Sequence, residues 1–253
     1  MSTPLPTLHS NTLCVVLCDL RRCRREDLEH HRALLSAAER QKNAALGHPA
    51  LRDRDTNCRG LLRRHLALLL DAPAKALTLQ TTGKGKPVLA NAHKSLHFNL
   101  SHSGNYAAIA FHKTAPVGID IERIDAAREP LRLSQRFFSA EESLALAALE
   151  EQDRLRQFYR LWTLKEAYIK TRGDSIFDGL RAPGFDVATQ QNDAGPHEER
   201  HWRDISNEEG WQFWSYLHDN EYQLAVASRR SKNPPGSGNQ SLSPEVIASP
   251  LLS

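Results

Sequence analysis

The sequence predicts an α+β fold of two similar halves related by a pseudo-twofold axis, each with a small antiparallel sheet and packed helices. One observation behind this prediction is an internal repeat. Residues 34–46 resemble residues 137–149 at an offset of 103 positions, and six of the compared positions are identical. The other is that helical and strand-like patterns follow one another in the same order around both copies. The expected domains are therefore an N-terminal half at 1–115, a C-terminal half at 116–229 and a disordered tail at 230–253.

In the N-terminal half, helix signals lie between strand signals. Ser36 followed by Glu39 has the spacing of a capping box, in which each residue binds the backbone amide of the other at a helix start. Leu62, Leu66 and Leu69 recur at helical spacing. The expected elements are a strand at 13–19, helices at 36–46 and 52–70, and strands at 77–80, 96–101 and 107–111.

The C-terminal half repeats this pattern. Ser139 and Glu142 form a second capping box, and a strongly helical segment precedes Gly173, a residue typical of helix ends. The expected elements are a strand at 118–122, helices at 139–149 and 153–171, and strands at 183–187, 211–217 and 222–228. From about residue 230 the chain is rich in Ser, Pro, Gly and Asn. We expect this tail to be disordered, so that deleting 231–253 changes neither the melting temperature nor the activity.

Composition excludes several classes of protein. Among the 253 residues, 25% are charged and 40% are apolar, and the formal net charge of +3 is too small to indicate nucleic acid binding. The longest aliphatic run, Leu66–Leu70, is far shorter than a membrane span. The four cysteines form no CxxC pair, which favours reduced thiols. We expect a soluble cytoplasmic monomer that binds neither nucleic acid nor membrane.

The most informative strand is Gly118–Glu122. Side chains alternate along a strand, so Asp120 and Glu122 project to one face with Cα atoms roughly 6.5 Å apart, while two isoleucines face a core. This arrangement suits a metal ion, and the alternative is a half-buried strand with a solvated acidic face. In the long helix, Glu166 and Lys170 lie four residues apart, which by itself is equally typical of a surface salt bridge.

Four motifs occur in a fixed order: Gly85-Lys86-Pro87, Phe98–Ser103, Gly118–Glu122 and Leu161–Lys170. Together they resemble the motif set of the 4'-phosphopantetheinyl transferases, and most closely that of the large, pseudodimeric, surfactin-type class. The resemblance extends from about Leu13 to Ala227. It implies transfer of phosphopantetheine from coenzyme A to a serine of an apo acyl or peptidyl carrier protein, with release of adenosine 3',5'-bisphosphate, as in a holo-[acyl-carrier-protein] synthase.

The resemblance also implies roles for individual residues. Asp120, Glu122 and Glu166 match the ligands of Mg²⁺, with Mn²⁺ as an alternative. Three adjacent carboxylates would repel one another without a cation, which favours metal dependence. Glu166 matches the general base, acting directly or through a metal-bound water, and Lys170 matches a position that contacts the phosphates and the leaving group. Coenzyme A contacts are implied for Lys42, Arg59, Gly85, Lys86, Pro87, Ser101, His102 and Lys170.

The sequence departs from the family pattern in two places. Relatives often carry two basic residues where this chain has Glu39 and Lys42, so Arg40 or Arg59 is a further candidate for the 3'-phosphate contact. The segment 173–180 is longer than the compact glycine turn of relatives. Two other functions remain as alternatives, a coenzyme A or nucleotide-binding module without catalysis and a metal-dependent phosphoesterase.

Overall fold

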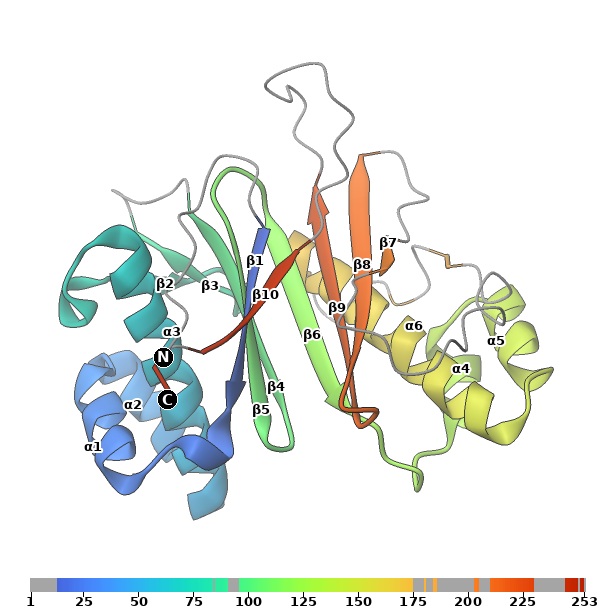
Figure 1. Ribbon diagram of the computed structural model, residues 1–253, viewed down its shortest axis with the longest axis horizontal. Helices are drawn as coiled ribbons and strands as arrows, with labels where there is room; N and C mark the ends of the chain where they lie inside the picture. The colour runs from blue at the N-terminus through green and yellow to red at the C-terminus, as the bar shows by residue number, and fades with distance from the viewer. Residues whose placement is uncertain are drawn as a thin grey trace. The chain divides into compact units, whose positions relative to one another are not determined.

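The chain folds into two compact units, and helices pack on small sheets in both, which confirms the α+β class (Figure 1). The first unit contains Met1–Thr114 and Pro244–Ser253, and the second contains Ala115–Ser243. None of the described helices is long and apolar enough to span a membrane. The computed structural model describes residues 13–83, 85–90, 96–174, 180, 184–185, 203–204, 210–229, 244–249 and 251–252.

The first unit is built on a four-stranded sheet with the order β10-β1-β5-β4. Strand β5 (Tyr106–His112) lies between β1 (Leu13–Asp19) and β4 (His97–Ser103), pairs antiparallel with both, and is buried along its whole length. A separate hairpin joins β2 (Leu79–Thr81) to β3 (Pro87–Leu89). Strands β2, β4 and β5 occur close to the predicted ranges 77–80, 96–101 and 107–111, whereas β3 was not predicted.

Three helices belong to this unit: α1 (Arg25–Leu34), α2 (Ala37–Ala44) and α3 (Pro49–Leu70). Two short 3₁₀ turns accompany them, η1 (Leu20–Arg22) and η2 (Ala74–Ala76). The capping box is confirmed, because Ser36 accepts from the Glu39 amide and Glu39 accepts from the Ser36 amide. Helix α3 begins before residue 52, since Pro49 suits the first helical position and His48 Nδ1 accepts from the Ala50 amide. Helix α1 was not predicted.

The C-terminal segment differs from the expected disordered tail. Strand β10 (Glu245–Ala248) pairs parallel with β1, as Figure 1 shows, and the Ser249 amide donates to the Leu17 carbonyl. Ile247 and Leu252 are buried in the core of the first unit. The expectation is therefore wrong for the described residues of 244–252. Composition over a 23-residue window concealed a short apolar segment that gains its stability from β1, far away in the sequence.

Removing residues 244–253 should consequently destabilise the protein. The truncation exposes the apolar surface that Ile247 and Leu252 bury and breaks the hydrogen bond between Ser249 Oγ and His65 Nε2 (3.1 Å). We expect a loss of about 3–5 kcal/mol, measured by urea unfolding of the full and truncated chains. Glu245→Ala, which changes an exposed residue of the same strand, is the control and should unfold like the wild type. A truncated chain as stable as the wild type would contradict the docking of this segment.

The second unit has a sheet with the order β6-β9-β8-β7. Its main strands are β6 (Val117–Arg123), β9 (Tyr222–Arg229) and β8 (Trp211–His218), and the two-residue β7 (Arg203–Asp204) pairs with β8. All described pairings are antiparallel. The predicted strand at 183–187 lies mostly outside the described residues.

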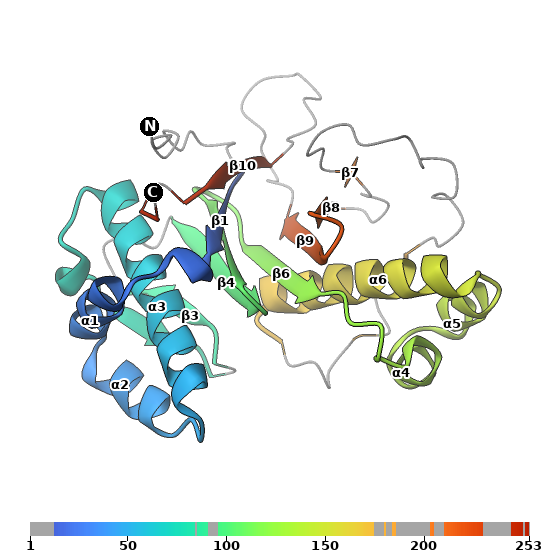
Figure 2. The ribbon, with the colours of Figure 1, turned by 60° about the horizontal axis from the view of Figure 1, so that its bottom comes forward.

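The helices of the second unit are α4 (Pro130–Phe137), α5 (Ala140–Ala147) and α6 (Glu151–Arg172). Ser139 caps α5 as predicted, and α4 was not predicted. Helix α6 packs along β6 and β9, as Figure 2 shows. It ends at Gly173, whose φ of 72° is the left-handed conformation that glycine adopts readily. This packing places the C-terminal half of α6 beside the acidic strand.

Candidate functional site

Strand β6 presents the acidic residues with the alternation that the sequence predicts. Ile119 and Ile121 are buried in the apolar interior. Asp120 is only 3% exposed, whereas Glu122, nearer the strand end, is partly exposed. A carboxylate as buried as that of Asp120 needs a compensating positive charge or hydrogen bonds.

Lys170 of α6 supplies that charge. Its Nζ lies 2.6 Å from Asp120 Oδ1, in an ion pair that joins residues fifty positions apart. Glu166, one turn earlier on α6, is 6% exposed. The reading of Glu166 and Lys170 as an ordinary surface salt bridge is therefore wrong, because Lys170 forms an ion pair with the acidic strand and Glu166 is buried.

Close contact between β6 and α6 sets this geometry. The Thr171 hydroxyl lies within hydrogen-bond distance of the carbonyl oxygens of Ala167 (2.8 Å) and Ala227 (3.0 Å), which share its single hydrogen, and the contact with Ala227 joins α6 to β9. A Cβ on Gly118 would lie 2.5 Å from the Thr171 amide nitrogen and closer still to the Ala167 carbonyl oxygen. Only glycine at position 118 allows the helix to approach β6 this closely.

The charges of this cluster influence one another. Burial raises the pKa of Glu166 to about 7; the negative charge of Asp120 also raises it, Lys170 opposes the rise, and Glu122 adds to it. For Lys170, burial acts to lower the pKa, but the charge and hydrogen bond of Asp120, together with the charges of Glu166 and Glu122, outweigh burial and the pKa is raised. Lys170 is therefore a stable cation, held between carboxylates.

The three predicted metal ligands suit Mg²⁺ by their chemistry. All are carboxylates, the oxygen donors that hard divalent cations prefer, and Asp120 and Glu122 lie close enough to Glu166 to raise its pKa. Among the described residues, however, no three His, Cys, Asp or Glu side chains are arranged as a ready metal site. The ammonium of Lys170 provides the positive charge beside Asp120 in this structure. The Mg²⁺ site thus stays a prediction.

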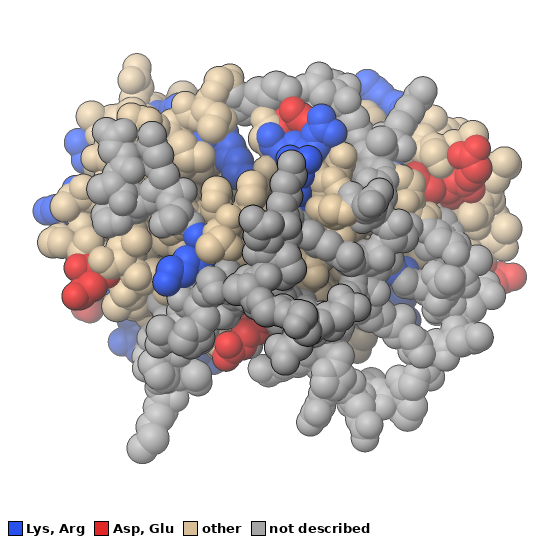
Figure 3. Space-filling view, turned by 90° about the horizontal axis from the view of Figure 1, so that it is seen from above, with Lys and Arg blue, Asp and Glu red and all other residues tan. Residues whose placement is uncertain are grey.

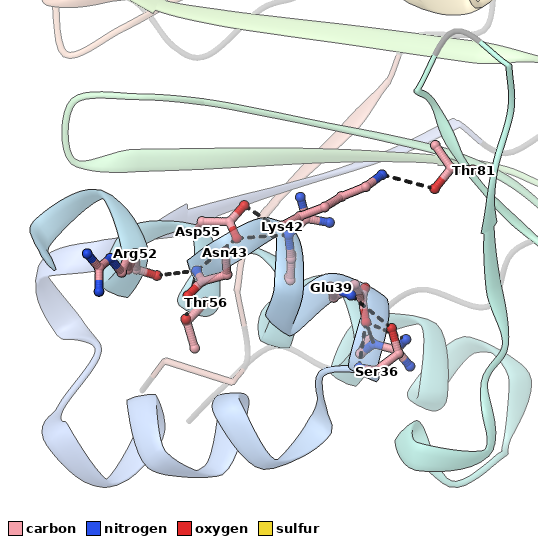
Figure 4. A network of polar contacts seen from close by, with 10 residues as sticks. Ser36, Glu39, Lys42, Asn43, Arg52, Asp55, Thr56 and Thr81 are labelled. Carbon is pink, nitrogen blue, oxygen red and sulfur yellow. Dashed lines mark hydrogen bonds and ion pairs between the residues drawn. The ribbon is translucent and has the colours of Figure 1, made fainter. Parts of the chain in front are cut away.

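In the first unit, Lys42 lies near the hairpin that carries Gly85, Lys86 and Pro87. Its Nζ is 3.5 Å from Thr81 Oγ1, and Thr81 pairs with Pro87 across the hairpin (Figure 4). Burial lowers the pKa of Lys86 to about 8. These predicted coenzyme A contacts are therefore neighbours in space, although about forty residues separate them in the sequence.

The remaining predicted residues of this unit lie on α3 and β4. Arg59 is bound by Asp55 on the preceding turn of α3, at 2.9 Å. Asp55 also accepts from Asn43, which orients α2 against α3 beside Lys42 (Figure 4). Ser101 is buried on β4 and His102 is exposed. The roles of these residues stay predictions.

An ion pair outside the predicted set of site residues joins α6 to α5. Lys165 is fully buried, and its Nζ lies 2.9 Å from Glu142 Oε1 on α5. From the sequence, Glu142 was assigned only a capping role and Lys165 was not singled out. The available signal for this ion pair was the position of Lys165 directly after Leu164, which is buried. A buried lysine requires a partner of opposite charge.

On the face of the molecule that Figure 3 draws, described basic side chains and described acidic side chains both occur, in separate small groups. That pattern does not by itself indicate a class of ligand.

Comparison with known proteins gives the family. Residues 116–227 match the 4'-phosphopantetheinyl transferase superfamily, and residues 25–114 match the N-terminal region of 4'-phosphopantetheinyl transferases. A putative 4'-phosphopantetheinyl transferase of Synechocystis is 34% identical over 176 residues, which cover 68% of this chain and 72% of the relative. The chain belongs to the 4'-phosphopantetheinyl transferase superfamily. The surfactin-type subclass remains an expectation.

Other members of the superfamily share shorter parts of their length with the chain. The human L-aminoadipate-semialdehyde dehydrogenase-phosphopantetheinyl transferase is 33% identical over 71% of this chain and 61% of its own length. A 4'-phosphopantetheinyl transferase of Nostoc is 36% identical over 57% of this chain and 62% of its own length. The matched segment thus spans less than two thirds of these two relatives.

Proposed function

We propose that this protein transfers 4'-phosphopantetheine from coenzyme A to a serine of an apo carrier protein, in the manner of a holo-[acyl-carrier-protein] synthase. The observation that carries the proposal is the cluster of Asp120, Glu166 and Lys170, in which a cation is held among carboxylates at the contact of β6 and α6. Membership of the superfamily supports the same reaction.

The reaction requires a proton acceptor and compensation of negative charge. The serine oxygen forms a bond to the phosphorus that carries the pantetheine, the phosphoanhydride bond breaks, and adenosine 3',5'-bisphosphate leaves. In our proposal Glu166 accepts the hydroxyl proton, directly or through water, and Lys170 faces the negative charge that develops on the leaving phosphate. Asp120, Glu122 and Glu166 would hold Mg²⁺, which supplies further charge neutralisation at the phosphate oxygens.

Basic residues of the first unit are proposed to hold the nucleotide part of coenzyme A. Lys42 lies beside the hairpin of β2 and β3 and Lys86 lies within it, where Gly85 adopts a φ of 93° at the turn between the two strands. Arg59, Ser101 and His102 complete the proposed set. Positively charged side chains are groups that bind phosphates in proteins.

The proposal is tested by incubating the protein with coenzyme A, Mg²⁺ and a panel of apo acyl and peptidyl carrier proteins, followed by intact-mass measurement. We expect one carrier or more to gain the phosphopantetheine increment, and adenosine 3',5'-bisphosphate to appear in equal amount. Cleavage of coenzyme A without modification of any carrier would instead indicate a phosphoesterase. Binding of coenzyme A with neither reaction would indicate a non-catalytic module.

Lys170→Met should lower kcat by about 10²-fold or more, because the variant removes the positive charge that opposes the leaving phosphate. Steady-state kinetics with the modified carrier measure the effect. Lys113→Met, which changes an exposed lysine after β5, is the matched control and should keep wild-type kinetics. An unchanged rate for Lys170→Met would show that Lys170 serves only to neutralise Asp120.

A further inference from the structure

A buried ion pair joins α6 to α5 at the residue that precedes Glu166 in the chain. Lys165 of α6 is 0% exposed and Glu142 of α5 is 3% exposed. The ammonium lies 5.3 Å from the ring centre of Phe138 and 5.6 Å from that of Phe185. Lys165 is therefore enclosed by protein groups, and its charge is not available to a substrate.

The Glu142 carboxylate connects three parts of the chain. Its Oε2 accepts from the Ser139 amide at the start of α5, while Oε1 accepts from the Phe185 amide (2.9 Å) and from Lys165. The same carboxylate thus caps α5, holds the backbone at residue 185 and binds α6. A buried charge with this many directed contacts defines one orientation of the helix that carries its partner.

The N-terminal half contains an equivalent pair. Glu39, which caps α2 from the position equivalent to Glu142, binds Arg63 of α3 at 2.7 Å, and Arg63 is 2% exposed (Figure 4 labels Glu39). Helices α3 and α6 each have 22 residues, and their bounds lie 102 positions apart, so Arg63 corresponds to Lys165. The buried cation thus stands at the same helix position in both halves, and in the C-terminal half the next residue, Glu166, is an acid that interacts with Asp120.

Consecutive residues of an α-helix point about 100° apart, so the direction of Lys165 determines that of Glu166. On the other flank of α6, the contact with Gly118 and the hydrogen bond from Thr171 to Ala227 fix the distance of the helix from the sheet. We propose that Lys165 is a positioning residue: its pairing with Glu142 fixes the rotation of α6 so that Glu166 faces Asp120. This inference rests on the proposed transferase function.

The test compares three variants with the wild type. Lys165→Met leaves the Glu142 carboxylate buried without its cation, and we expect the melting temperature to fall by roughly 10 °C. Combining Lys165→Met with Glu142→Gln removes both charges, so most of this loss should be regained. In the double variant kcat should still be about 10–100-fold below wild type, because the orientation of Glu166 is no longer fixed. The KM for coenzyme A should change by less than about threefold.

The matched control is the combination of Arg63→Met and Glu39→Gln, which removes the equivalent pair from the half without the acidic cluster. Its kcat should stay within about twofold of wild type. A crystal structure of the Lys165→Met/Glu142→Gln variant gives a readout independent of activity, in which we expect the Glu166 carboxylate to be displaced relative to Asp120.

The proposal would be overturned by wild-type kcat in the Lys165→Met/Glu142→Gln variant, by an equal loss of kcat in the control, or by an unmoved Glu166 in the crystal structure. A raised KM with unchanged kcat would also overturn it, since Lys165 would then act in binding. Absence of transfer by the wild type would refute the proposed function instead, and the crystal structure would still test the positioning role.

Discussion

Replacing Asp120 with asparagine should reduce carrier modification by at least about 10³-fold while leaving the protein folded. The substitution keeps the shape of the side chain but removes the carboxylate that pairs with Lys170 at 2.6 Å and that is proposed to bind Mg²⁺. Because the Lys170 side chain is 28% exposed, solvent can stabilise its charge once the pair is lost. The fold should therefore survive, as measured by thermal unfolding.

The rate is measured by intact mass of the carrier over a range of Mg²⁺ concentrations, and metal affinity by calorimetric titration. We expect the variant to lose both turnover and Mg²⁺ binding. Asp153→Asn, on the exposed first turn of α6, changes the same residue type and should behave as the wild type. Substantial Mg²⁺-dependent turnover by Asp120→Asn would exclude Asp120 as a metal ligand.

Gly118→Ala should destabilise the second unit. The added Cβ would lie 2.5 Å from the Thr171 amide nitrogen and overlap the Ala167 carbonyl oxygen. Backbone atoms of a long helix cannot rotate away as a flexible side chain does, so α6 must shift from β6. We expect a loss of about 3 kcal/mol in the free energy of unfolding.

Gly118→Ala should also lower kcat by about 10²-fold, because Glu166 and Lys170 move with the helix while Asp120 stays on the strand. Urea unfolding and steady-state kinetics measure the two effects. Gly47→Ala is the control, since a Cβ there has no atom within 4 Å, and both quantities should be unchanged. Wild-type stability in Gly118→Ala would mean that α6 lies further from β6 than the structure indicates.

Local patterns predicted the elements of both halves well where the signal lies within a few residues. The two capping boxes join a serine to a glutamate three positions later, and the hydrogen bonds of both occur in the structure. The alternation at Gly118–Glu122 placed Asp120 on the face opposite two buried isoleucines. Helices α1 and α4 were missed, since neither begins with a side-chain cap of the preferred residue types.

Partners that are distant in the sequence were not predictable in the same way. Lys170 pairs with a strand residue fifty positions earlier, whereas the spacing of Glu166 and Lys170 was by itself equally typical of a surface salt bridge. The apolar residues of β10 form a strand by pairing with β1, a partner that is distant in the sequence. Composition of the tail therefore predicted disorder where the structure has a strand.

The sequence by itself determined the α+β class, the repeated halves, the acidic strand and the family resemblance, because each depends on residue order and short-range periodicity. Only the tertiary structure decided which charges meet: Lys170 with Asp120, and Lys165 with Glu142. The physical reason is burial. A lysine or carboxylate removed from water must find an opposite charge within a few ångströms, and packing of helix on sheet alone determines which one is there.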